Sequence, residues 1–257
     1  MMKLYTFATS PYARKVRIAL DYKGVACDYA ERCYSLDRKQ DLRSAAERAE
    51  VPVLILDDGR AIADSTIISE YLEQVYPHPP LYPRDAYERA RMRTIEDLCD
   101  RTFDAVGFGY FLAVLRSDAP EARAMQAAAR AECRALMETF ERELGDREYF
   151  CGDLSLADIA AICHAPLALV MKIDLADLPR TRAWMDRLRT IPAVAADRER
   201  ASAAWAGVHN LAAEFEGPDG KIHWRDSRLE WPVRNGFIEL VAREFKAGKM
   251  MFPPRAT

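Results

Sequence analysis

The sequence predicts an α/β domain followed by an all-helical domain. Strand and helix patterns alternate over the first 76 residues, whereas residues 86–205 have the periodicity of helices almost throughout. Between them lies YPHPPLYPRD, whose prolines interrupt helices and stiffen a connection. We therefore expect domains at 1–78 and 86–206, followed by an extension at 207–257 whose packing the sequence leaves open.

The first half of the N-terminal domain reads as strand, helix, strand. KLYTF is a short apolar strand, and a helix over 11–23 follows it, with Pro11 in its first turn. A second strand is expected near 26–31. It leads into the polar stretch 35–50, which we expect to be a connection.

The second half reads as a β-hairpin and a helix. VPVLIL and AIA flank Asp58-Gly59, a dipeptide typical of tight hairpin turns. The next segment carries apolar side chains at the i, i+3, i+4, i+7 spacing of one helix face: Ile68, Tyr71, Leu72 and Val75. The expected order is therefore β-α-β, a connection, and β-β-α.

Helical signals dominate the rest of the chain. Residues 121–144 place one apolar stripe along a long helix: Cys133, Leu136, Met137, Phe140 and Leu144. SLADIA has a capping-box pattern, with Asp158 three residues after Ser155. A further helix carries Trp184, Leu188 and Ile191 before Pro192. In the extension, RDSRLEWPVRNG is mixed in character and FIELVAREFKAG reads as one more helix, ended by Gly248.

Composition argues against several classes of protein. The 257 residues are 50% hydrophobic and 30% charged, with a net charge of −3, which provides no basic footprint for nucleic acid. No apolar run approaches the ~20 residues of a membrane-spanning helix, and the N-terminal apolar stretch is too short for a signal peptide. We therefore expect a cytoplasmic protein without nucleic-acid or membrane partners. The six cysteines and four histidines are scattered, so we expect buried thiols rather than disulfides, and no metal site.

The turn TSPYARK places a hydroxyl residue, Ser10, directly before a helix. Serine is a favoured N-cap, so a purely structural role is one reading. The other is chemical, because a hydroxyl at the positive end of a helix can also hold an anion. On this stretch alone the capping role is the commoner one.

Four motifs together resemble the cytosolic glutathione transferases. They are TSPYARKVRIAL, VPVL, ADSTIISEYLE and SLADIA, which occur in that family's order and span roughly residues 1–205. The resemblance is to a serine-type member, similar to bacterial theta- or zeta-class proteins. It implies a thioredoxin-like N-terminal domain, a helical-bundle C-terminal domain, glutathione as cosubstrate and a homodimer.

The resemblance implies that Ser10 is catalytic and stabilises the thiolate of glutathione. A free thiol has a pKa of ~8.5, so lowering it by ~2 units requires about 2.7 kcal/mol. A hydrogen bond to the anion supplies roughly 1.5–3 kcal/mol and a helix N-terminus roughly 0.3–1 kcal/mol. Thr9 is the neighbouring hydroxyl and the alternative. Cysteine is absent from this turn, which disfavours thiol exchange.

The resemblance also implies the groups that hold glutathione. The peptide bond before Pro52 would be cis and present the backbone of Val51 to the cysteinyl amide. Asp64 would pair with the γ-glutamyl ammonium, and Ser65 with its carboxylate at a helix N-terminus. The full expected set is Ser10, Pro11, Tyr12, Lys39, Val51, Pro52, Asp64 and Ser65.

One departure from the family concerns the residues before Val51. Many relatives have Gly-Lys or Gly-Gln there, whereas this chain has Ala49-Glu50. Glu50 would repel the carboxylates of glutathione, so its glycine end would need a cation from elsewhere. The candidates in the sequence are Arg38, Lys39 and Arg43, although a solvated charged surface is the commoner meaning of such a run.

We expect the electrophile to bind between the domains, against RTFDAVGFGYFLAVL. Its candidate contacts are Arg101, Phe103, Phe108, Tyr110 and Phe111, although such aromatic residues more often form core. Gly107 and Gly109 would permit a bend. HWRDSRLEW, in the extension, would either cover this pocket or pack on a partner subunit.

The first hypothesis is therefore a homodimeric glutathione transferase that attacks a small apolar electrophile. A specialised dehalogenase, isomerase or ether-cleaving enzyme is a variant of it. The second hypothesis is a non-enzymatic, transferase-like binding protein, motivated by Glu50 and by the extension.

Overall fold

The computed structural model describes the chain except for residues 32–41, 43–44, 47–49, 207–220 and 253–257. Its N-terminal part has the predicted β-α-β, β-β-α order. The elements are β1 (Lys3–Thr6), α1 (Pro11–Tyr22), β2 (Asp28–Glu31), β3 (Val53–Ile55), β4 (Ala61–Ala63) and α3 (Ser65–Val75). The strands form one sheet in the order β2-β1-β3-β4, with β1 parallel to β2 and the other pairs antiparallel. The α/β class and the thioredoxin-like arrangement predicted from the sequence are confirmed.

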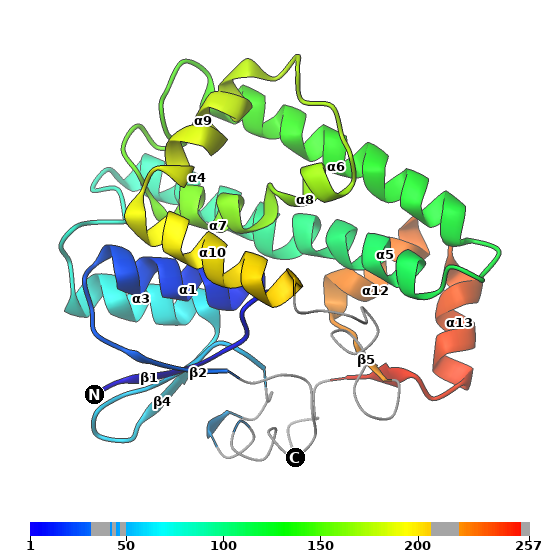
Figure 1. Ribbon diagram of the computed structural model, residues 1–257, viewed down its shortest axis with the longest axis horizontal. Helices are drawn as coiled ribbons and strands as arrows, with labels where there is room; N and C mark the ends of the chain where they lie inside the picture. Colours follow the sequence, from blue (N-terminus) through cyan, green and yellow to red (C-terminus); the bar gives the residue numbers. More distant parts are fainter. Residues whose placement is uncertain (32–41, 43–44, 47–49, 207–220, 253–257) are drawn as a thin grey trace.

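Helices α1 and α3 lie over the same face of this sheet, below α7 and α10 in Figure 1. Because α1 is covered on both sides, its polar residues Lys15 and Arg17 are as buried as Leu20. On α3, Leu72 is buried as expected, but Val75 is 47% exposed, so the apolar face stops short of the end of the helix.

A group of helices follows, as the sequence predicts. They are α4 (Ala86–Asp97), the π-helical segment η1 (Leu98–Phe103), α5 (Asp104–Leu115), α6 (Ala122–Leu144), α7 (Leu156–His164), α8 (Leu167–Val170), α9 (Pro179–Arg189) and α10 (Pro192–Ala206). The stripe predicted on α6 is buried, and the capping box at Ser155 and Asp158 is formed. Ile191 lies beyond the end of α9. Within the described part of the chain, no helix is both long and apolar enough to cross a membrane.

The connection between α3 and α4 is packed rather than a free spacer. Leu81 is buried, and Lys23 donates from Nζ to the carbonyl oxygens of Tyr76 and Pro79 at 2.8 and 2.9 Å. The prolines therefore stiffen a segment that itself contributes to the core.

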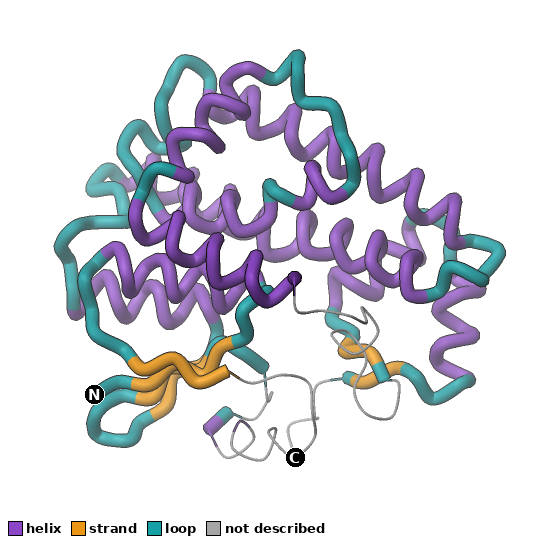
Figure 2. Tube along the Cα trace, viewed as in Figure 1, coloured by secondary structure: helices purple, strands orange, loops and turns teal. Residues whose placement is uncertain are grey.

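The C-terminal extension forms β5 (Ile222–His223), α12 (Asp226–Arg234), α13 (Ile238–Lys246) and β6 (Met250–Met251). The helix α13 was predicted, with Gly248 just beyond it at φ +67°. The helix α12 was not, because Pro232 lies inside it. Strands β5 and β6 pair in parallel, in a ribbon that lies apart from the four-stranded sheet (Figure 2). Helix α12 packs against α5, which brings the extension beside the helical domain.

Candidate active site

A pocket of about 230 Å³ lies where the N-terminus of α1 faces the helical part and the extension. The N-terminal part contributes the turn before α1 and the segment at Val51. The helical part contributes η1, α5 and the residues from Cys163 to Val170. The extension contributes His223, Arg225 and Arg228, so HWRDSRLEW covers the pocket of its own chain, one of the two arrangements left open by the sequence.

Ser10 caps α1 and lines the pocket. Its backbone is extended, with φ −66° and ψ 118°, and its Oγ accepts a long hydrogen bond of 3.4 Å from the backbone N–H of Ala13. The hydroxyl donates to no group in the described parts of the chain. Thr9 also lines the pocket but does not cap the helix. Ser10 therefore combines a hydroxyl proton available for a ligand with the positive end of a helix.

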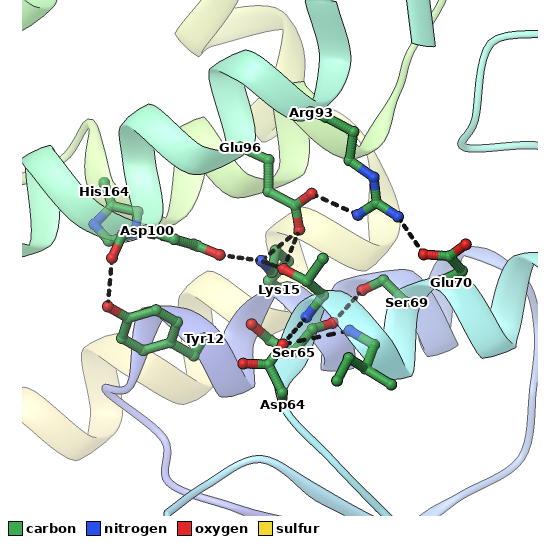
Figure 3. Close-up of polar contacts among 12 residues, drawn as sticks. Tyr12, Lys15, Asp64, Ser65, Ser69, Glu70, Arg93, Glu96, Asp100 and His164 are labelled. Atoms are coloured by element: carbon green, nitrogen blue, oxygen red, sulfur yellow. Dashed lines mark hydrogen bonds and ion pairs between the residues drawn. The ribbon is translucent and has the colours of Figure 1, made fainter. Parts of the chain in front are cut away.

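Tyr12 lines the same pocket, but its hydroxyl is already committed. The hydroxyl donates to the backbone carbonyl oxygen of Asp100 at 2.7 Å (Figure 3). Burial is the main cause that raises the pKa of Tyr12 well above its ordinary value. The guanidinium of Arg225 lies 4.7 Å from the centre of its ring. Tyr12 therefore acts as a neutral, fixed wall of the pocket.

The peptide bond between Val51 and Pro52 is cis, as the resemblance implies. Val51 lines the pocket, whereas Pro52 is buried behind it. The backbone N–H and C=O of Val51 make no hydrogen bond to the described residues, so both can meet a peptide ligand.

Glu50 contacts two residues of the extension, Arg225 and His223. Arg225 donates to both of its carboxylate oxygens, at 3.1 and 2.7 Å, and Nδ1 of His223 lies 3.2 Å from Oε1. A cation from the extension therefore lies beside Glu50, and the expected repulsion between Glu50 and the carboxylates of glutathione stays a prediction. Lys39, Arg38 and Arg43 lie outside the described residues.

A second ion pair joins the extension to the floor of the pocket. Arg228 binds both oxygens of Asp104 at 2.8 and 2.9 Å, and its guanidinium lies 5.0 Å from the centre of the Phe108 ring. Although burial opposes ionisation, the charge of Arg228 holds the pKa of Asp104 below its usual range. Asp104 and Arg228 therefore form an ionised pair, in which the guanidinium balances the charge of the carboxylate.

Behind these residues lies a polar network of Lys15, Glu96 and Asp100, with His164 beside Asp100 but not hydrogen-bonded to it (Figure 3). Nζ of Lys15 is 2.7 Å from Oε1 of Glu96 and 2.5 Å from Oδ2 of Asp100. Burial raises the pKa of Asp100 to about 6 in spite of Lys15. Burial lowers the pKa of His164 to about 4, so its imidazole is neutral at neutral pH.

Asp64 and Ser65 lie at the start of α3, apart from the residues that line the pocket. Asp64 is at φ +80°, a conformation that few residues other than glycine adopt, and it accepts from the N–H of Thr66 at 2.8 Å. Ser65 is buried and bonded through its carbonyl oxygen to the hydroxyl of Ser69 (Figure 3). Their expected contact with glutathione stays a prediction.

The helix expected to line the electrophile site does so only in part. Phe103, Phe108 and Phe111 line the pocket, whereas Arg101 and Tyr110 do not. Arg101 is exposed and paired with Asp97 at 2.8 Å, whereas Tyr110 is partly buried against the core, with its ring 5.8 Å from that of Phe111. Both lie in the same short segment as the three phenylalanines, but their side chains lie outside the pocket lining.

The glycines of α5 provide room for neighbouring side chains. The helix continues through both, and the bend that they would permit stays a prediction. A Cβ on Gly109 would lie 2.3 Å from the indole of Trp231, and one on Gly107 would lie 3.0 Å from a methyl group of Leu167. Gly109 therefore lets α12, and the arginines at its start, approach α5 closely.

Sequence reasoning missed Asp100, Asp104, His164, Arg225 and Arg228. They stand singly on helices or at a helix start, with no local spacing that marks a site. The one available signal was the presence of a glutamate at position 50, where many relatives have a neutral or basic residue. A carboxylate that becomes buried there needs a cation from elsewhere in the fold.

Comparisons with known proteins agree with this architecture. Residues 4–80 match the family described as "Glutathione S-transferase, N-terminal domain", and residues 103–192 match "Glutathione S-transferase, C-terminal domain". The chain is 31% identical over 212 residues to "Probable glutathione S-transferase BZ2" of Zea mays, covering 75% of this chain and 88% of that protein.

Two solved structures resemble this chain over most of their own length. A glutathione S-transferase from Methylobacterium radiotolerans, in complex with glutathione sulfonate, is 32% identical with a TM-score of 0.67, covering 76% of this chain and 93% of that one. A maleylacetoacetate isomerase from Anaeromyxobacter dehalogenans, with bound dicarboxyethyl glutathione and citrate, is 26% identical with a TM-score of 0.64, covering 77% and 94%.

Proposed function

Because the chain belongs to the glutathione S-transferase family, we propose that Ser10 activates the thiol of glutathione for attack on a small, largely apolar electrophile. The family confirms the class of enzyme predicted from the sequence, a glutathione transferase. The structure of the relative from M. radiotolerans with glutathione sulfonate supports glutathione as the cosubstrate.

The observation that carries the role of Ser10 is its hydroxyl at the N-terminus of α1, which lines the pocket and donates to no described group. A thiolate placed there would receive a charge-assisted hydrogen bond and face the positive end of the helix. Together these effects supply roughly 2–4 kcal/mol, enough to lower a thiol pKa by ~2 units. The hydroxyl of Tyr12 is bound to Asp100 and does not compete for this role.

The residues around Ser10 suit a peptide cosubstrate. The backbone of Val51, which makes no hydrogen bond to the described residues, can pair with the cysteinyl amide as an added strand would. Arg225 lies beside Glu50 at the same end of the pocket, so the extension brings positive charge close to where a carboxylate of glutathione would bind. We propose that Asp64 and Ser65 hold the γ-glutamyl end.

The pocket also has apolar side chains that suit a small aromatic or alkyl electrophile. They include Phe108 and Phe111 on α5 and Leu167 and Val170 on α8. The whole pocket is about 230 Å³ and must also hold the cysteinyl part of glutathione, so we expect an electrophile no larger than a single ring with a reacting group.

A related isomerase activity is a second candidate, favoured by the similarity to the maleylacetoacetate isomerase from A. dehalogenans. The dehalogenase and ether-cleaving variants have no comparable support. The non-enzymatic alternative is motivated by Glu50 and by the extension, and the ion pair with Arg225 weakens the first of these arguments.

Replacing Ser10 by alanine tests the proposed role against a matched control. We expect kcat/KM for glutathione-dependent turnover to fall by ~10- to 100-fold in Ser10→Ala, because the hydrogen bond to the thiolate is lost. Thr9→Val, which removes the neighbouring hydroxyl, should change it less than ~3-fold. If Thr9→Val carries the loss instead, the acting hydroxyl is Thr9.

We further propose a homodimer. Large apolar side chains are exposed on neighbouring helices, with Ile67 on α3 57% exposed and Tyr87 on α4 72% exposed. A second copy would bury such side chains. Sedimentation velocity at micromolar concentration measures the mass directly, and a purely monomeric species would contradict the proposal.

A further inference from the structure

His164 is a buried polar residue in the lining of the pocket. It is the last residue of α7, is 6% exposed and lines the pocket. The rings of Tyr12 and Phe103 flank its imidazole, with centroids 6.3 and 5.8 Å away. Nε2 lies 4.0 Å from Oδ1 of Asp100, which is too long for a hydrogen bond.

Neither ring nitrogen of His164 has a hydrogen-bond partner in the described parts of the chain. Buried polar groups are usually paired, so such a residue calls for an explanation. The fully enclosed side-chain atoms that lack a partner there belong to Tyr82, Trp224 and Trp231, not to His164. The polar edge of His164 is therefore open, and the space beside it is the pocket (Figure 3 shows it next to Tyr12 and Asp100).

The surroundings of His164 keep it neutral. Burial is the largest cause, and the nearby cations Lys15, Arg14 and Arg228 add to it, while Asp104 opposes them; the pKa falls to about 4. A neutral imidazole has one N–H donor and one acceptor nitrogen. It can donate to an oxygen that is gaining negative charge without bringing a second charge into the pocket.

We infer that His164 donates a hydrogen bond to an oxygen of the electrophile, and that the preferred substrates are small aryl epoxides and similar compounds whose reacting carbon bears such an oxygen. The apolar walls hold the ring, and His164 supplies the polar contact at the reacting end. This inference rests on the proposed function, because the thiolate at Ser10 is the attacking group.

The reaction step balances without a further cofactor. The thiolate sulfur forms a bond to an epoxide carbon, the bond from that carbon to oxygen breaks, and its electron pair stays on the oxygen. His164 donates its N–H to the oxygen as this charge develops, and the alkoxide then takes a proton from water. The product is a thioether with a neighbouring hydroxyl group.

Two glutathione conjugates that differ by one hydroxyl group test the contact by binding. They are S-(2-hydroxy-2-phenylethyl)glutathione, the product of opening styrene oxide, and S-(2-phenylethyl)glutathione, which lacks the hydroxyl. Calorimetry on the full chain should show wild type preferring the hydroxylated conjugate by ~2- to 10-fold. His164→Phe keeps an aromatic ring and should abolish this preference, and His164→Gln, which keeps a donor, should restore part of it.

Kinetics provide a second readout. The ratio of kcat/KM for styrene oxide to that for benzyl chloride, whose leaving chloride has no oxygen, should fall by ~10-fold or more in His164→Phe. A merely structural role would lower both values together. If wild type binds both conjugates and the hydroxyl preference is unchanged in His164→Phe, the inference is wrong. If wild type binds neither conjugate, the proposed function itself fails.

Discussion

Replacing Arg225 by glutamine removes the guanidinium that binds both oxygens of Glu50, at 3.1 and 2.7 Å. The two side chains are only 23% and 16% exposed, so solvent screens the pair less than an ordinary surface ion pair. Charged hydrogen bonds of this kind are worth roughly 1.5–3 kcal/mol. We therefore expect Arg225→Gln to lower the free energy of unfolding by about 2 kcal/mol.

The same change should weaken glutathione binding. Glu50 keeps His223 beside it but loses the guanidinium of Arg225, so its negative charge would repel the carboxylates of the ligand more strongly. We expect the Kd for glutathione to rise by ~5- to 10-fold, and Glu50→Gln in the Arg225→Gln background to recover most of the loss.

A double-mutant cycle over Glu50 and Arg225 separates the pair from its surroundings. Urea unfolding of the four proteins should give a coupling energy of about 2 kcal/mol. Arg234→Gln is the control, because Arg234 pairs with Glu132 but is 53% exposed and should change stability by less than about 0.5 kcal/mol. Additivity of the two substitutions to within about 0.5 kcal/mol would refute the reasoning.

Two further substitutions test packing and protonation. Gly109→Ala places a Cβ 2.3 Å from the indole of Trp231, so urea unfolding should show a free energy of unfolding lower by about 1–3 kcal/mol. Gly107→Ala is the control and should lose less, because its Cβ meets only a methyl group of Leu167 at 3.0 Å. Equal losses of stability would contradict this account of Gly109. For His164, the pKa is lowered from 6.5 to about 4, so between these pH values the unfolded chain binds more protons than the folded one. As the pH falls from 6.5 to 4, the free energy of unfolding of wild type should therefore fall by up to about 3 kcal/mol more than that of His164→Phe. If the two proteins lose stability in parallel over this pH range, His164 is not buried in its neutral form.

Local sequence patterns predicted most of the fold. The strands, the cap at Ser10, the hairpin turn and the capping box at Ser155 each depend on residues that are neighbours in the chain. The cis bond at Pro52 was implied by the family resemblance. Helix α12 was missed because local rules place Pro232 outside helices. Its packing against α5 outweighs that preference.

The candidate site was predictable only where it follows a motif. Ser10 and Val51 lie in motifs, and the structure brings both to one pocket. His164 and Asp104 acquire their environment from helices distant in sequence, and Arg225 reaches Glu50 across 175 positions. No local spacing encodes such contacts, because the fold alone creates them.

The pKa of the glutathione thiol in the bound state tests the central claim most directly. Ultraviolet titration of the thiolate, with glutathione saturating, measures it in wild type and in Ser10→Ala. A hydrogen bond from Ser10 predicts a pKa near 6.5–7 in wild type, about 2 units below the free thiol, and a rise of about 1–2 units in Ser10→Ala. An equally low pKa in both proteins, with glutathione still bound, would contradict the assignment of Ser10 as the group that activates the thiol.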